Sequence, residues 1–385
     1  MTTLIRAPEA ARILGVSPAT LYAYVSRGRL NRRTAPDGRT SLYARDEVER
    51  LAARSRRAAP GPRPTIDVQI TSAVTQLDEG GLRFRGHDVV ELVRDHSFED
   101  VAELLWSGAV PAAPVSWPAP ERADVHRCAP VAALDVSPIA RLAITADVLA
   151  NAHPDDDAVT AARRLILLAP GALGSRRRGG PFAGRLAAAW RPRHDDALTA
   201  AIDRSLALLA DHELATSTLA VRIAASVRAS PYAAIAAGLA TLEGALHGSA
   251  AAMAHAFLAE CAAAEPATAI ARWRRDHRVV PGFGHSIYRG VDPRFGPLME
   301  AVGPLDPSGD RVALVDAAIT EVGRVLPHQP NVDLALGALS WIAGFDPGTP
   351  LFAVARIAGW AAHYDEELAE RPVRFRGVAR PRPAS

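Results

Sequence analysis

The sequence predicts a predominantly α-helical protein made of a small basic domain and a larger acidic helical body. From about residue 87 onward, apolar residues recur mainly with the spacing of an amphipathic helix. Segments with strand-like alternation are few and short. The hydrophobic fraction of 49%, much of it alanine, and the aromatic fraction of 5% suit a helix-rich globular chain. These observations together predict the all-α class.

The charge of the chain divides it into two parts. The formal net charge is +2, but residues 1–64 contain thirteen arginines and five acidic residues, so they carry +8 and the remainder carries −6. The stretch Arg54–Pro64 is rich in arginine, proline and alanine, which is typical of a linker. We therefore expect an N-terminal domain over 1–56, a linker over 57–70 and a body over 71–385. A basic domain is typical of nucleic-acid binding, although a solvated basic tail would have the same composition.

The composition excludes several chemistries. All 44 basic residues are arginines, so the chain has neither a phosphate-binding Walker lysine nor a Schiff-base lysine. The two cysteines, Cys128 and Cys261, are too few for a four-cysteine zinc site, an iron–sulfur cluster or a disulfide framework. No apolar run is long enough to span a membrane, and the N-terminal segment is too polar for a secretory signal. The expected location is therefore the cytoplasm.

The N-terminal domain has the pattern of short helices followed by a hairpin. Residues 7–14 form a short amphipathic helix that Gly15 ends, and Ser17 caps a second helix that ends near Gly28. The elements expected after it are strands 30–34 and 40–43, joined by a turn at Asp37-Gly38, and a third helix that Asp46 caps.

This order of helix, glycine-containing turn, helix and hairpin resembles the winged helix-turn-helix domain of MerR-like and excisionase-like DNA-binding proteins. The resemblance implies that the second helix enters the major groove of DNA. The candidate DNA contacts are Thr20, Tyr22, Arg27, Arg32, Arg33 and Arg39. The alternative is a domain that mediates only self-association or contacts with other proteins.

The body begins with short strands and continues as helices. Residues 66–71 and 82–84 have strand-like patterns on either side of a Gly80-Gly81 turn, and a helix is expected from His87. Apolar periodicity predicts further helices over 101–106, 138–152, 158–169, 197–226 and 233–261. Residues 171–180, with the sequence GALGSRRRGG, are expected to form an exposed loop.

Groups capable of chemistry occur at a few places in the body. The candidates are His212 on a predicted helix, His247 between two glycines at a helix break, His285 in a glycine-rich turn and Asp333 at a helix start, accompanied by Arg294, Arg356 and Arg374. Each has an ordinary structural alternative, because a lone helical histidine is more often structural and Asp333 could serve only as a helix cap. No two histidines have HExxH spacing, so no metal site is expected.

Five motifs follow one another in the body. They are HEL…ST from residue 212, GxLHG at 244–248, GFGHxxYR…DPR at 282–294, PNVD at 330–333 and ARxxGWxAH at 355–363. In this order they resemble the citrate synthase family, as does the segment LRFRGHDVVEL…SFEDVAELLWSG near the start of the body. The resemblance spans about residues 70–380. It implies a homodimer in which a small domain, 221–327, closes over a large domain, 71–220 and 328–385.

The resemblance also implies an acyltransferase reaction. Family members condense an acyl-CoA with a 2-oxo dicarboxylate: acetyl-CoA and oxaloacetate give citrate, as in the tricarboxylic acid cycle, and propionyl-CoA gives 2-methylcitrate. The matched catalytic residues are Asp333 as base, His247 as donor to the thioester oxygen and His285 as donor to the ketone. His212, Arg294 and Arg356 match oxaloacetate-binding residues, Arg374 matches an arginine supplied by the neighbouring subunit, and Gly282, Phe283 and Gly284 match a turn that approaches CoA. No metal or redox cofactor is implied.

Several positions depart from the family pattern. The family usually has Asn, Pro, Gly and Arg where this chain has Ala215, Ala245, Ser249 and Ser286. These departures leave every matched catalytic residue in place, but they leave open the choice of acyl-CoA and the rate. An inactive body is one alternative. Another is a DNA-binding regulator whose citrate synthase-like body senses a metabolite.

Overall fold

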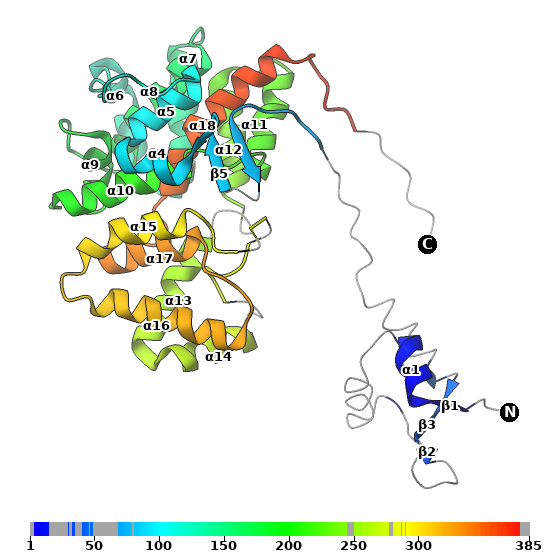
Figure 1. Cartoon of the computed structure of the whole chain (residues 1–385). Helices are drawn as coiled ribbons and strands as arrows, with labels where there is room; N and C mark the ends of the chain where they lie inside the picture. The colour runs from blue at the N-terminus through cyan, green and yellow to red at the C-terminus, as the bar shows by residue number, and fades with distance from the viewer. Residues whose placement is uncertain are drawn as a thin grey trace. The chain divides into compact units, whose positions relative to one another are not determined.

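The computed structural model describes most of the chain, namely residues 4–14, 30, 33–34, 41–45, 47–48, 68–78, 81–244, 250–276, 280–285, 287–288 and 290–377. The chain divides into two compact units, Met1–Thr71 and Ser72–Ser385 (Figure 1). The division falls beside residue 70, where the expected linker ends.

The first unit contains a three-stranded antiparallel sheet and a short helix. Its elements are β1 (Leu4–Arg6), α1 (Ala7–Leu14), β2 (Arg33–Thr34) and β3 (Ser41–Ala44), and the strand order is β1-β3-β2. Ile5 pairs with Tyr43 across β1 and β3, and both side chains are buried with Ala10, Leu30 and Val48. The predicted helix over 7–14 and the predicted hairpin are confirmed. Strand β1 was not predicted, because three residues are too few to show alternation.

The predicted second helix lies outside the described residues, as do Thr20, Tyr22, Arg27, Arg32 and Arg39. Arg33 lies in β2, but its side chain is outside the described part.

The second unit opens with a small antiparallel sheet. Its strands are β4 (Thr75–Asp78), β5 (Gly81–Phe84) and β6 (His87–Asp88). The predicted strand over 66–71 is wrong for the described residues 68–71; pairing begins instead at Thr75, opposite the buried Phe84. The helix expected from His87 begins at Val89, because the carboxylate of Asp88 caps it by accepting from the N–H of Val90 at 2.8 Å.

The rest of the unit is helical. The helices are α4 (Val89–Asp95), α5 (Phe98–Ser107), α6 (Arg122–Cys128), α7 (Pro138–Ala152), α8 (Ala158–Ala172), α9 (Phe182–Ala187), α10 (Asp196–Leu209), α11 (Thr216–Ser226), α12 (Pro231–Leu242), α13 (Ala250–Ala264), α14 (Pro266–Asp276), α15 (Phe295–Val302), α16 (Asp310–Val325), α17 (Val332–Ala343) and α18 (Leu351–Ala369), with 3-10 turns η1 (Ala129–Ala133) and η2 (Gly303–Leu305). The all-α prediction is thereby confirmed. No helix in the described part of the chain is long and apolar enough to cross a membrane.

One predicted helix is divided at a place that matters for the site. The continuous helix expected over 197–226 is wrong: α10 ends at Leu209, α11 begins at Thr216, and His212 lies in the turn between them. The backbone N–H of Gly359 on α18 donates to the carbonyl of Ala210 at 3.1 Å. A β-carbon at Gly359 would collide with Asp211. The close approach of α18 therefore holds this turn, and the sequence pattern of one segment does not reveal it.

The helices of the second unit form two groups (Figure 1). Helix α18 packs against α8, α10 and α11, and α12 packs against α7. In the other group, α13 packs against α17 and α14 against α16, while α15 contacts both α17 and α10. This grouping differs from the expected small domain 221–327: α12 packs with the large group, and α17 packs with the small one. The apolar faces of these helices decide the grouping, since each buries against its nearest partner.

Candidate active site

The glycine-rich turn is joined to the segment that precedes α17. The N–H of Gly284 donates to the carbonyl of Gln329 at 2.8 Å, and the N–H of Asn331 donates to the carbonyl of Gly282 at 3.0 Å. The side-chain amide of Asn331 also donates to the carbonyl of Gly284 at 2.7 Å. These bonds bring His285, which follows the turn directly, next to the N-terminus of α17.

Gly282 is required by this junction. Its φ is +81°, which favours glycine, and a β-carbon there would lie 2.7 Å from the β-carbon of Leu334. The next residue, Phe283, packs edge-on against Phe257 with ring centroids 6.2 Å apart. The turn 282–284 therefore has a structural task in this chain, and the CoA contact expected of it stays a prediction.

The first turn of α17 carries Asp333. The side-chain oxygen of Asn331 caps the helix by accepting from the N–H of Asp333 at 3.0 Å. The cap alternative proposed for Asp333 is therefore wrong, since Asn331 is the capping residue. The Asp333 carboxyl group lines a cavity instead.

This cavity, which we call the active-site cavity, has a volume of about 280 Å³. It gathers most of the predicted site residues from four separate stretches of sequence: His212 from the turn between α10 and α11, His285 and Arg294 from the glycine-rich turn and its continuation, Asp333 from α17 and Arg356 from α18. Ala215 also lines it, so the family position that is usually Asn faces the same space.

The protonation of His285 follows from its hydrogen bonds. Its Nδ1 accepts from the backbone N–H groups of Ile287 at 3.1 Å and Tyr288 at 3.3 Å. A nitrogen that accepts carries no proton, so the neutral ring is protonated at Nε2. Burial, with a smaller effect from the nearby Arg294, lowers the pKa of His285, so the ring is neutral near pH 7. His285 is thus a neutral hydrogen-bond donor.

His212 is held in the same neutral state. Its side chain is 8% exposed, and its Nε2 lies 3.0 Å from the hydroxyl of Tyr288. The rings of His212 and His285 meet edge to face with centroids 5.5 Å apart. Burial and the positive charges of Arg294 and Arg356 hold the pKa of His212 well below its usual range.

Arg294 is a paired cation. Its Nε lies 2.9 Å from Oδ1 of Asp292, and its Nη2 lies 2.7 Å from Oδ2 of the same carboxylate. Burial alone would lower the pKa of Arg294, but the Asp292 carboxylate raises it above its ordinary value. Asp292 also accepts from the N–H of Val332 at 3.1 Å, so the ion pair is fastened to the start of α17. Asp292 was not predicted as a site residue, although it belongs to the DPR motif.

Arg356 is a buried cation that forms no ion pair with a described residue, although the carboxylate of Asp211 lies near enough to raise its pKa slightly against the effect of burial. Its side chain is 0% exposed, and its Nε donates to the carbonyl of Leu209 at 3.1 Å. Nη1 and Nη2 have no hydrogen-bond partner among the described residues. Burial lowers the pKa of Arg356 to about 10. A buried guanidinium edge with free donors is a ready site for a carboxylate, which it can bind through two parallel hydrogen bonds.

The environment of Asp333 favours the protonated form of its carboxyl group more than solvent does for a surface carboxylate. Burial raises its pKa to about 6; the nearby Arg294 lowers it and Asp292 raises it further. A carboxyl group with a pKa near the working pH is suited to accept and return a proton.

Two predicted residues are not part of the described cavity. His247 lies outside the described residues, together with Ala245 and Ser249. Arg374 lies away from the cavity, because its Nε and Nη2 bind both oxygens of Glu367 in the same chain at 2.6 Å and 2.5 Å.

A buried polar network behind the site was also missed. Asp211 accepts from the hydroxyl of Thr75 at 2.5 Å and lies 3.1 Å from Nε2 of His363. The other ring nitrogen of His363 lies 3.0 Å from Nη1 of the fully buried Arg222. His363 ends the ARxxGWxAH motif, so the motif supplied the only sequence signal for this network.

The fold and the cavity define a class of protein. A buried arginine with unpaired donors, a neutral imidazole donor and a carboxyl group with a raised pKa are the groups needed by an enzyme that makes a carbanion equivalent and adds it to the carbonyl of an acidic substrate.

Comparison with known proteins gives the particular family. The model of the family described as "Citrate synthase, C-terminal domain" matches residues 66–382, and that of a helix-turn-helix domain matches residues 4–56. A 2-methylcitrate synthase of Mycobacterium tuberculosis is 29% identical over 77% of this chain and 84% of its own. A citrate synthase of Haloferax volcanii is 30% identical over 75% of this chain and 86% of its own.

Solved structures agree on the fold. Citrate synthase from Pyrobaculum aerophilum superposes with a TM-score of 0.67 at 23% identity, over 83% of this chain and 92% of that one. Citrate synthase from Thermotoga maritima gives a TM-score of 0.68 at 22% identity, over 83% and 95%. The chain belongs to the citrate synthase family and is an enzyme of the citrate synthase type, preceded by a helix-turn-helix domain.

Proposed function

We propose that the protein condenses an acyl-CoA with oxaloacetate in its active-site cavity, with the roles of the individual residues set out below. The observation that carries the proposal is Arg356, which lines a cavity shared with Asp333 and His285 and whose two buried terminal nitrogens lack partners among the described residues. A buried cation in this state is costly unless an anionic ligand completes it. The names of the relatives favour the enzyme over a purely metabolite-sensing regulator.

In the first step, Asp333 removes a proton from the carbon next to the thioester. The enolate that forms must be stabilised at its oxygen, because the parent C–H is a weak acid. By the family resemblance, His247 donates to that oxygen. The pKa of Asp333, raised to about 6 by burial, brings the base closer to the acidity of its substrate than a surface carboxylate would be.

In the second step, the enolate carbon attacks the ketone of oxaloacetate and forms a carbon–carbon bond. The Nε2–H group of His285 donates to the ketone oxygen and then supplies the proton that the resulting alkoxide takes up. Water afterwards hydrolyses the thioester, and the bond to sulfur breaks to release CoA. The proposed steps use no metal or redox cofactor.

The carboxylates of oxaloacetate are bound by arginine. Both terminal nitrogens of Arg356 are available to donate to a carboxylate, whereas two nitrogens of Arg294 are already bound to Asp292. We assign one carboxylate to Arg356 as the main contact and give Arg294 a supporting role. His212, neutral and buried, would donate or accept at a substrate oxygen.

The experiment that tests this function measures CoA release from acetyl-CoA and, in parallel, from propionyl-CoA, each with oxaloacetate. We expect oxaloacetate-dependent release with at least one of the two thioesters, and their ratio of kcat/KM decides between citrate and 2-methylcitrate. A folded protein that releases no CoA with either thioester contradicts the proposal.

We further propose a homodimer in which a neighbouring subunit supplies one arginine. Arg374, the residue matched by resemblance, is bound to the buried Glu367, whereas Arg371 on the same segment is exposed. We therefore expect Arg371→Ala to lose activity and to regain it in mixed dimers with His285→Ala, since each such dimer contains one site with both residues. Arg374→Ala is the matched control and should lower Tm more than activity. A mixture that stays inactive argues against a shared site.

The first unit is proposed to bind DNA in the cytoplasm. The helix-turn-helix match over residues 4–56 and the excess of arginine over acidic residues support this. The triple variant Arg32→Ala, Arg33→Ala, Arg39→Ala should weaken duplex binding and flatten its salt dependence, because fewer phosphates are neutralised. Arg122→Ala, an exposed arginine of α6, is the control. Equal affinity of the triple variant and the wild type at every salt concentration would remove these residues from the interface.

A further inference from the structure

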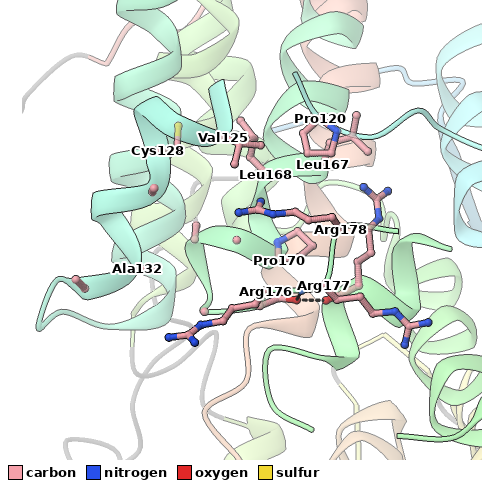
Figure 2. A pocket seen from close by; sticks show the side chains of 17 residues that line it. Pro120, Val125, Cys128, Ala132, Leu167, Leu168, Pro170, Arg176, Arg177 and Arg178 are labelled. Atoms are coloured by element: carbon pink, nitrogen blue, oxygen red, sulfur yellow. Dashed lines mark hydrogen bonds between the residues drawn. The ribbon is translucent and has the colours of Figure 1, made fainter. Parts of the chain in front are cut away.

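A second cavity, which we call the arginine pocket, lies between α6, η1, α8 and α9. Its volume is about 460 Å³, and it shares no lining residue with the active-site cavity. Figure 2 shows an apolar wall to which Val125, Leu167 and Leu168 contribute. The loop after α8 carries Arg176, Arg177 and Arg178 in succession at the same pocket (Figure 2).

The charged side chains that line the arginine pocket are all positive. Its cations are Arg176, Arg177, Arg178 and Arg185, and no aspartate or glutamate lines it. Within the described part of the chain, none of these four arginines forms an ion pair. The neighbouring arginines of α8 behave differently: Arg163 binds Glu103 at 2.7 Å, and Arg164 binds Asp124 at 2.7 Å. The positive charge of the pocket is therefore not balanced by a carboxylate in its lining.

Arg185 is the buried one of the four arginines that line the pocket. Its side chain is 4% exposed, and its Nε has no hydrogen-bond partner among the described residues. Its guanidinium lies 5.8 Å from the ring centroid of Phe182, a contact that supplies no anion. Burial lowers the pKa of Arg185, and the attraction of the buried Glu99 offsets this only in part. A guanidinium in this state gains from any anion that reaches it.

The loop is positioned relative to Arg185 by the fold. The hydroxyl of the buried Ser175 donates to the carbonyl of Arg185 at 2.7 Å, and the N–H of Ser175 donates to the carbonyl of Pro170 at 2.8 Å. The first residues of the loop are thus fixed to both α8 and α9, so the three exposed arginines stay at the rim of a pocket whose inner cation is Arg185.

From this arrangement we propose that the arginine pocket binds a small polyanion with an apolar part, of the size and chemistry of a nucleotide. The phosphate groups lie among Arg176, Arg178 and Arg185, which bind phosphate oxygens through paired N–H donors. Arg177 is already engaged, because its Nε donates to the carbonyl of Gly179 at 3.2 Å and its Nη1 lies 3.2 Å from Nε2 of His194. The flat apolar part packs against the wall formed by α6 and α8. A pocket of this size with an apolar wall and a few convergent polar groups is typical of small-molecule sites.

Three probes separate the two halves of the proposed ligand. ATP carries both the charge and a flat ring system, pyrophosphate carries the charge alone, and adenosine carries the ring system alone. Isothermal titration calorimetry of the full chain should give the tightest binding for ATP, weaker binding for pyrophosphate and the weakest for adenosine. CoA itself carries an adenine nucleotide and would compete at either cavity, so variants of the arginine pocket are used to locate the binding.

Two variants locate the binding. The double variant Arg176→Ala, Arg178→Ala removes exposed charge without touching the core and should weaken ATP binding at least tenfold. Arg185→Met, which keeps the buried volume, should weaken it by a similar factor, and circular dichroism checks its fold. Arg122→Ala, on α6 but outside the pocket lining, should leave it unchanged. Absence of ATP binding, or equal affinity in the double variant and the wild type, would overturn the proposal.

Discussion

Replacing Asp333 with asparagine is expected to reduce condensation by roughly 10³-fold and at the same time to stabilise the folded protein above pH 6. The loss of activity follows from removing the base that takes the substrate proton. The gain in stability follows from the pKa of Asp333, which burial raises to about 6 from an ordinary 3.8. Because the folded state disfavours the ionised carboxylate, the wild type bears a cost at neutral pH that the asparagine variant lacks.

The difference in stability between Asp333→Asn and the wild type depends on pH. Below the unfolded pKa the carboxyl group is protonated in both states, so Asp333→Asn and the wild type should then have nearly equal Tm values. As pH rises through about 6, the wild type loses up to about 3 kcal/mol relative to the variant. Thermal denaturation of both proteins between pH 4 and pH 8 measures this divergence. Turnover of the wild type should fall as pH drops through about 6, because Asp333 is then protonated and can no longer accept the substrate proton.

Asp310→Asn is a matched control for this experiment. Asp310 is an exposed aspartate in the first turn of α16, as Asp333 is in the first turn of α17, but it lies outside the cavity. Its replacement should change neither turnover nor the pH dependence of Tm appreciably. If Asp333→Asn keeps wild-type turnover, another group is the base and the proposed first step is wrong.

The second large effect is expected for Arg356→Met. Losing the guanidinium fork should reduce kcat/KM for oxaloacetate on the order of 10²–10³-fold, since breaking a buried charge pair with a carboxylate costs about 2–5 kcal/mol. The substrate-free variant should be at least as stable as the wild type, because methionine fills similar space without burying a cation. Burial lowers the pKa of Arg356 to about 10, so the wild type bears this cost at every pH below that value.

Ligand-induced stabilisation provides the direct measurement. Oxaloacetate should raise the Tm of the wild type, because binding to the folded state alone adds to stability, and should leave that of Arg356→Met nearly unchanged. Arg311→Met is a suitable control: Arg311 also donates to main-chain carbonyls, those of Trp341 and Ile342, but it lies outside the active-site cavity. An undiminished oxaloacetate shift in the Arg356 variant would assign the carboxylate to other residues.

The sequence motifs identified most of the residues that line the active-site cavity. They did not identify the residues that hold those side chains in place. His212, His285, Arg294, Asp333 and Arg356 were proposed from sequence, and the fold brings them to one cavity. Their partners were missed, because a partner such as Asp292 or Asp211 is recognised only by what it contacts. The protonation of His285, too, depends on two backbone N–H groups whose direction no sequence pattern specifies.

The prediction of one continuous helix over 197–226 is wrong because a distant element, α18, contacts this segment. The apolar period over 197–226 runs through His212 without a proline or glycine, so the segment by itself favours a continuous helix. The structure breaks it because α18 presents Gly359 to the carbonyl of Ala210. That contact joins residues far apart in the chain, and it is also what turns His212 toward the cavity.

The sequence by itself determined the helical class, the division into a basic first unit and an acidic second one, the family and the chemical types available at the site. These depend on local periodicity, composition and ordered motifs, all of which a linear chain displays. Only the tertiary structure decided which cations are free. Arg294 and Arg374 are bound to carboxylates of their own chain, while Arg356 and Arg185 are buried with donors that lack partners among the described residues. All four residues are arginines, so the sequence does not distinguish them. They differ in whether they are paired, because burial and the distance to a counter-charge are properties of the folded chain.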